Sequence, residues 1–198
     1  TGNRGHYLKE TGEYVGRFGI NVFPRFQIGG AGAFLKVNTG PGTQQPPEMS
    51  IEQRYTPQEA IGVDRQAHYA RGAVYAQYDW RDNPGGLAKK GGFYNLRLVY
   101  NKDVRYDTYS FRQLDAEIQQ YVPFFNERRV LAFRGRTELT YPNAGQQQVP
   151  FYMQPVLGGS DDLRGYRNFR FYGDNLILLN GEYRWEIFSG LDMAFFAD

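Results

Sequence analysis

Long runs in which apolar and polar residues alternate constrain this chain more than any other feature. Successive side chains of a β-strand point to opposite faces, so a period of two predicts strands with one apolar and one polar face. Such runs cover Arg71–Asp82, Phe93–Asn101, Arg112–Val122, Val130–Tyr141, Ile177–Trp185 and Leu191–Asp198. Two glycine-rich runs, Tyr14–Phe23 and Gln27–Val37, predict weaker strands. We therefore expect an all-β chain with about eight antiparallel strands.

The length of these runs favours a membrane-spanning sheet. Arg71–Asp82 and Val130–Tyr141 are each about twice as long as an ordinary globular strand of roughly 5–6 residues. Their length suits the tilted strands of about 9–11 residues that cross a bilayer. Aromatic residues gather near the run ends, as in the girdles of transmembrane barrels: Trp80, Tyr100, Phe111, Tyr121, Phe124, Phe125, Tyr141 and Trp185. Alternation alone leaves a soluble β-sandwich binding module open as another fold.

Composition narrows the functional classes. The chain has no cysteine, which excludes disulfides and cysteine-ligated zinc. Its net charge of +2 lacks the basic excess of a nucleic-acid partner. The two histidines, His6 and His68, are isolated, and no nucleophile or phosphate-loop motif is complete. We expect no catalytic residue, no metal and no cofactor, and therefore no enzyme.

The chain contains no apolar run near the roughly 18 residues that a membrane-crossing helix needs. It also starts without a signal peptide and stops inside an apolar alternating run. We expect it to be part of a longer exported protein.

Long and short connections alternate between the predicted strands. The segments Thr39–Gln66 and Pro142–Phe171 are long, whereas the other connections are tight or moderate. Transmembrane barrels place long loops outside the cell and short turns in the periplasm, so we expect both long segments to be exposed outside. A short helix within Ile51–Ala60 fits the first loop. A helix over Ser110–Gln120 is the weaker alternative to a strand there.

One segment of the second long loop, Pro150–Tyr166, combines glycines with apolar residues and an arginine. Such a loop is expected to pack against other parts of the protein, and Arg164 offers a planar donor fork that suits carboxylates. By alternation, Glu182 and Asp198 lie on the inner face of the next two strands. We predict a loop folded back into a barrel and tied by an arginine–carboxylate pair. The neighbouring Asp161–Asp162 is expected to be a solvated pair rather than a cation site.

The same segment resembles the BamA-like superfamily of outer-membrane insertases, also called the bacterial surface antigen family. Leu157-Gly158-Gly159 followed by Leu163-Arg164-Gly165-Tyr166 is similar to the loop motif of that family. Asn180–Arg184 is similar to its Glu-Tyr-Arg strand, and Phe195–Asp198 to the start of its Phe-x-Asp-x-Gly strand. The resemblance spans roughly Gly72–Asp198. It implies a lumen-loop motif of Gly158, Gly159, Leu163, Arg164, Gly165 and Tyr166, anchored by the carboxylates of Glu182 and Asp198.

The resemblance also implies the organisation and role of the whole protein. Residues 1–198 would be part of one outer-membrane barrel domain of about sixteen strands, with POTRA domains and the last strands outside the chain. The implied function is the assembly, insertion or translocation of outer-membrane proteins. A two-partner-secretion-type transporter and a general diffusion porin remain alternatives. Expected partners are outer-membrane lipid, a nascent outer-membrane or secreted protein, and accessory periplasmic or lipoprotein subunits.

Overall fold

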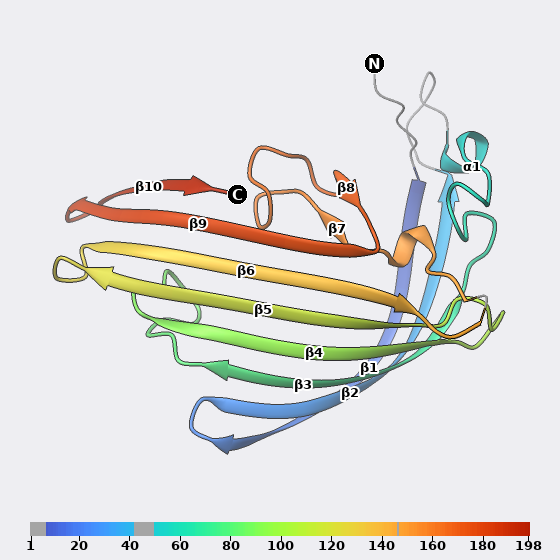
Figure 1. The fold of residues 1–198 in the computed structure, drawn as a ribbon, viewed down its shortest axis with the longest axis horizontal. Coiled ribbons are helices and arrows are strands. Elements are labelled where there is room, and N and C mark those ends of the chain that lie inside the picture. The colour runs from blue at the N-terminus through green and yellow to red at the C-terminus, as the bar shows by residue number, and fades with distance from the viewer. Residues whose placement is uncertain (1–6, 42–49, 146) are drawn as a thin grey trace.

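Eight long strands form one antiparallel sheet in the computed structural model, which describes residues 7–41, 50–145 and 147–198 (Figure 1). The sheet order is β1-β2-β3-β4-β5-β6-β9-β10. The strands are β1 (Tyr7–Phe23), β2 (Phe26–Pro41), β3 (His68–Asp79), β4 (Gly91–Asp103), β5 (Phe111–Phe124), β6 (Arg129–Pro142), β9 (Asn175–Phe188) and β10 (Leu191–Ala197). A two-stranded sheet pairs β7 (Val156–Leu157) with β8 (Phe171–Tyr172), and the helical turns are α1 (Ile51–Arg54) and η1 (Phe151–Met153).

The strand prediction is confirmed, with shifts at the ends. The first strand begins at Tyr7 rather than Tyr14, and the third ends at Asp79 rather than Asp82. Residues 111–124 form a strand, so the helical alternative for that segment is wrong. Among the described residues, no helix is long and apolar enough to cross a membrane.

Every neighbouring pair of strands is antiparallel, so the connections lie at two opposite ends of the sheet. One end, which we call the turn end, carries the connections after β1, β3, β5 and β9. The other, the loop end, carries both long connections and the one after β4 (Figure 1). The long connections therefore share one side, as a transmembrane barrel requires.

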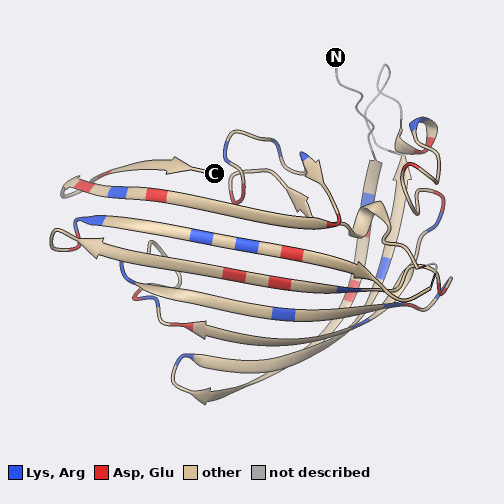
Figure 2. Ribbon diagram, viewed as in Figure 1, with Lys and Arg blue, Asp and Glu red and all other residues tan. Residues whose placement is uncertain are grey.

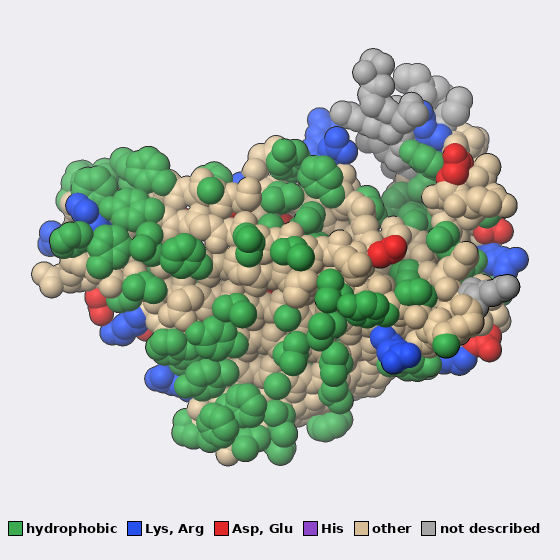
Figure 3. All heavy atoms as spheres, viewed as in Figure 1, with side chains coloured by type: hydrophobic (Ala, Val, Ile, Leu, Met, Phe, Trp, Pro, Cys, Tyr) green, Lys and Arg blue, Asp and Glu red, His purple; other side chains and the backbone are tan. Residues whose placement is uncertain are grey.

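The two faces of the sheet differ sharply in chemistry. The outward face shows apolar side chains in mid-strand, including Val74, Leu96, Leu98, Ile118, Phe133, Ile177 and Leu179. Figure 3 shows hydrophobic side chains spread over the strands, with charged side chains mostly near the strand ends. The inward face carries the charges: acidic positions of β5 lie beside basic positions of β6 in Figure 2. Apolar side chains outward and charged side chains inward are the pattern of a lipid-embedded barrel.

An aromatic belt crosses the outward face near the turn end. Its ring contacts join neighbouring or next-but-one strands: Phe26 with Phe23, Phe23 with Tyr78, Tyr78 with Tyr94, then Phe124 with Tyr183 and Tyr183 with Phe195. The girdle predicted from strand ends was wrong for two residues. Phe111 is fully buried on the inner face, and Tyr121 faces the inward Arg184. A place near a strand end predicts how deep a residue lies in the membrane. Which face of the sheet the residue occupies depends on the alternation of side chains along the strand.

Parts of both long connections pack together as an apolar cap at the loop end. Ile51, Ala60 and Val63 from the first and Phe151 and Tyr152 from the second are buried in one cluster. The cluster also includes inward residues of β2, β3 and β5: Leu35, Val37, Tyr69 and Phe111. The expectation that Thr39–Gln66 is an exposed loop is therefore wrong for the buried residues Ile51, Ala60 and Val63, whereas residues 56–59, 64 and 65 are exposed. Residues 42–49 lie outside the described residues. The loop carries enough apolar side chains to bury its own backbone.

The two faces lead to a prediction on adjacent residues of β4. Leu96 points outward and is 47% exposed, whereas Asn95 points inward. Leu96→Arg should lower the free energy of unfolding in lipid vesicles by about 2–4 kcal/mol, since it places a charge against lipid. Asn95→Arg is the matched control and should leave it nearly unchanged. Denaturant titration followed by tryptophan fluorescence measures both. Equal losses in the two variants would show that the outward face does not meet lipid.

Candidate functional site

The second long connection, which joins β6 to β9, folds back along the inner face of the sheet. After η1 it forms the β7–β8 pair, and the residues between these strands make a tip that lies against the sheet (Figure 1). Gly158 and Gly159 have φ values of 131° and 97°, which residues with a side chain rarely adopt. A Cβ on Gly158 would overlap the backbone oxygen of Arg167, and one on Gly159 would overlap the side chain of Asn168. The two glycines thus permit the tight packing of the tip.

Arg164 extends from the tip to the last two strands of the sheet. Its Nε and Nη2 donate to Oδ2 and Oδ1 of Asp198 at 2.9 and 2.6 Å, and its backbone N–H donates to Oδ2 at 2.9 Å. Its Nη1 donates to Oε2 of Glu182 at 3.0 Å. The hydrogen bonds that Arg164 donates to Asp198 hold the pKa of its guanidinium above the ordinary value. The structure thus brings together the arginine and both carboxylates that the sequence singled out.

An aromatic ring on β10 completes the Arg164 contacts. The Arg164 guanidinium carbon lies 3.6 Å from the ring centroid of Phe196, a close cation–π contact. Sequence reasoning missed Phe196, although its parity with Asp198 places it on the inner face. Asn180 of β9 adds two donors from Nδ2, to Oδ1 of Asp198 and to the backbone oxygen of Asp162, each at 2.8 Å.

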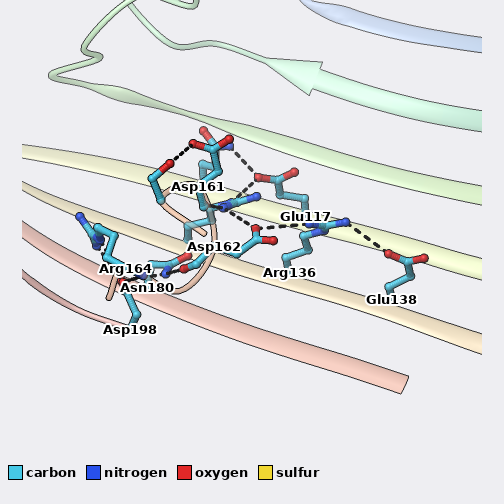
Figure 4. A network of polar contacts seen from close by, with 11 residues as sticks. Glu117, Arg136, Glu138, Asp161, Asp162, Arg164, Asn180 and Asp198 are labelled. Carbon is cyan, nitrogen blue, oxygen red and sulfur yellow. Dashed lines mark hydrogen bonds and ion pairs between the residues drawn. The ribbon is translucent and has the colours of Figure 1, made fainter. Parts of the chain in front are cut away.

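Asp162 binds the sheet on the other side of the tip. Its Oδ1 lies 3.4 Å from Nη1 of both Arg134 and Arg136 on β6, and Arg134 also donates to the backbone oxygen of Asp161 at 2.6 Å (Figure 4). Each of the two arginines also donates a hydrogen bond to a carboxylate of the sheet, Arg134 to Glu117 of β5 and Arg136 to Glu138 of β6.

The expectation of a solvated Asp161–Asp162 pair is therefore wrong for Asp162. Its side chain is 16% exposed, because β6 presents two inward arginines beneath it. The alternation of β6 could have shown that Arg134 and Arg136 point inward. It could not show that the tip would lie over them, since that depends on the path of the loop.

Glu182 links the tip to the turn end of the sheet. Its Oε1 accepts from Nε of Arg184 at 2.6 Å while Oε2 accepts from Arg164. Arg184 in turn donates to the backbone oxygen of Ala88 at 3.1 Å. Ala88 lies in the connection between β3 and β4, residues 80–90, which reaches across to β9, where Lys89 pairs with Glu186 at 3.0 Å. One carboxylate thus joins a loop-end segment to a turn-end segment.

The other residues of the predicted motif have smaller parts. Leu163 forms an isolated β-bridge with Gly159, and Gly165 has a φ of 92°. Tyr166 is 52% exposed and packs edge-on against Phe171 rather than against the sheet. Of the motif side chains, Arg164 therefore provides the main contact with the strands.

A cleft of about 270 Å³ lies between the tip and the inner face, lined by residues including Arg134, Arg164, Arg184, Asp161 and Glu182. Its walls carry both signs of charge. Within the described parts of the chain, no group of three or more His, Asp or Glu residues is placed to hold a metal ion.

This geometry can be compared with known proteins. Residues 48–198 match the Omp85 superfamily domain. The chain belongs to the Omp85 superfamily. Its structure is similar to that of BamA from Haemophilus ducreyi lacking POTRA domains 1–3, with a TM-score of 0.69 and 17% sequence identity, covering 96% of this chain and 41% of that chain. No curated protein matches the sequence.

Family and fold together place this Omp85 chain in the outer membrane as part of a BamA-like barrel. The described sheet is open, with β1 and β10 at its edges, and corresponds to a piece of such a barrel. The chain spans 41% of the BamA chain that it matches, so its sheet corresponds to part of a larger fold.

The contacts of Asp162 lead to a prediction for the Omp85 loop. Asp162→Arg places a third cation beside Arg134 and Arg136 and should release the tip from β6. Loss of charge-assisted contacts should raise trypsin cleavage within residues 158–170 of the folded full-length protein by roughly ten-fold. Asp161→Arg adds a trypsin site at the neighbouring position. The Asp161 side chain is exposed and, among the described residues, is hydrogen-bonded only to Ser160, so cleavage should rise far less. Equal cleavage of both variants would contradict a specific role of Asp162.

Proposed function

We propose that this Omp85 chain is the barrel part of a machine that inserts proteins into the outer membrane. The observation that carries the proposal is the loop tip held against the inner face of the sheet, with Arg164 bonded to Glu182 of β9 and to Asp198 directly after β10. A loop that bridges two neighbouring strands stabilises one arrangement of the wall. This arrangement suits a barrel whose own strands stay in a defined position while the strands of a client protein fold beside them.

The proposed mechanism breaks no covalent bond. An unpaired backbone group in lipid costs several kcal/mol, so a strand entering the bilayer alone faces a large barrier. A barrel with an apolar outward face and a polar inward face offers both environments across one sheet. A client strand that folds beside it can pair its backbone before it meets lipid. The client would be a nascent outer-membrane protein.

A secretion transporter of the two-partner type is the second candidate, and the charged inner face favours it. Arginines and carboxylates face inward on β3, β4, β5, β6 and β9, with an open cleft beside the tip. Such a lining suits an unfolded polar chain in transit. A free diffusion pore fits less well, because the tip is bonded across the inner face. For either candidate we propose that residues 1–198 belong to one barrel domain preceded by POTRA domains, with accessory periplasmic or lipoprotein subunits.

Both candidates give a prediction for Arg164. Arg164→Ala removes the guanidinium that binds Asp198 and Glu182. The ratio of released to bound loop tip should therefore rise by about ten-fold or more. Cells that depend on this variant should accumulate less folded outer-membrane protein, measured in purified outer membranes. Arg164→Lys keeps the charge without the fork and should rescue only in part.

The control is Arg167→Ala, an exposed arginine of the same loop, which should assemble outer-membrane proteins at the wild-type level. If Arg164→Ala instead leaves outer-membrane protein levels normal but traps one secreted protein in the periplasm, the transporter is the function. Normal levels of both in a folded Arg164→Ala protein would contradict both candidates.

A further inference from the structure

Arg129 is an outward-facing arginine at the turn end of β6. Its partners across the sheet are Phe124 on β5 and Trp185 on β9. Directly opposite residues of antiparallel strands share a face. Arg184, which precedes Trp185, bonds to inward groups, so Trp185 and Arg129 face outward. An arginine on the lipid-facing side of a barrel is costly except near the water boundary.

Two aromatic rings hold the Arg129 guanidinium. Its carbon lies 4.8 Å from the ring centroid of Phe125 and 4.9 Å from that of Trp185. Phe125 reaches this position because the turn after β5 has three consecutive positive φ values, 49°, 57° and 60°, at residues 125–127. Ring contacts stabilise a guanidinium through its face and leave the donors in its plane free.

Those in-plane donors have no partner within residues 7–41, 50–145 and 147–198. Two carboxylates near this turn are engaged elsewhere, Glu127 with Lys90 and Glu186 with Lys89, each at 3.0 Å. Inward arginines behave differently, because each of these pairs with a carboxylate: Arg71, Arg97, Arg134, Arg136 and Arg184. Arg129 is thus positioned by rings and offers a donor fork to something outside the chain.

The aromatic belt indicates what that group is. Phe124 and Tyr183 of the belt stack beside Arg129 on the outward face. Aromatic girdles lie at the level of the lipid headgroups, where the nearest anions are phosphates. A phosphate presents oxygens that a guanidinium fork binds in a bidentate manner. We propose that Arg129 binds the phosphate of a membrane phospholipid in the leaflet at the turn end of the barrel.

This inference rests on the outer-membrane barrel and is independent of whether the barrel inserts or exports proteins. Native mass spectrometry of the delipidated full-length protein in detergent tests it, with phosphatidylglycerol as the probe. Arg129→Gln should weaken phosphatidylglycerol binding by roughly ten-fold, and Arg129→Lys should weaken it less. Arg128→Gln is the matched control, because Arg128 is exposed and neighbours the same turn. Circular dichroism checks that every variant stays folded.

Two further probes identify the source of the phosphate. Diacylglycerol, which lacks the phosphate, should bind equally weakly to wild type and Arg129→Gln. Inorganic phosphate should not displace phosphatidylglycerol at millimolar concentration. The proposal is overturned if Arg129→Gln and Arg128→Gln weaken binding equally, if Arg129→Gln retains wild-type binding, or if free phosphate replaces the lipid. Normal protein insertion by a variant that has lost lipid binding would leave the proposed function intact.

Discussion

Charge neutralisation across the inner face is the interaction on which this structure depends. The outward face of the sheet meets lipid, so charged side chains in the middle of the strands have only the inner face to occupy. Inward charges are tolerated when each one is paired. Neighbouring strands meet this need with opposite signs, as when Arg134 of β6 bonds Glu117 of β5 and Arg97 of β4 bonds Asp115 of β5. The inward charges also make the strand register specific, since a shift by one residue would turn them to the outward face.

The loop tip fits this wall because it carries both signs of charge in the matching order. Asp162 lies over the arginines of β6, and Arg164, two residues on, lies over Glu182 of β9 and Asp198 directly after β10. A tip with only one charge could rotate about its anchor, whereas two opposite charges fix its direction along the sheet. Glycines with positive φ allow the bends on either side. The orientation of the loop is therefore determined by electrostatics, and its shape by the backbone.

Sequence reasoning found the features that local periodicity determines and missed those that depend on long-range packing. The strands and the Arg164 carboxylates could be predicted because alternation fixes which face a residue occupies. The role of Asp162 could not, because nothing local shows that the tip lies over β6. Phe111 was assigned to a girdle from its place at a strand end, yet it is fully buried under the cap. The cap itself, built from Ile51, Tyr152 and their neighbours, brings together segments far apart in the chain.

The contacts of Arg164 also determine how the tip can be released. Three of its bonds go to Asp198, which directly follows β10, and one goes to Glu182 of β9. Glu182 keeps its bond to Arg184 when Arg164 leaves, whereas the side chain of Asp198, 6% exposed, would keep only Asn180. Release is therefore more costly on the β10 side than on the β9 side. A displacement of β10 would break the stronger set of bonds, so the tip resists separation of β9 from β10 in addition to their backbone pairing.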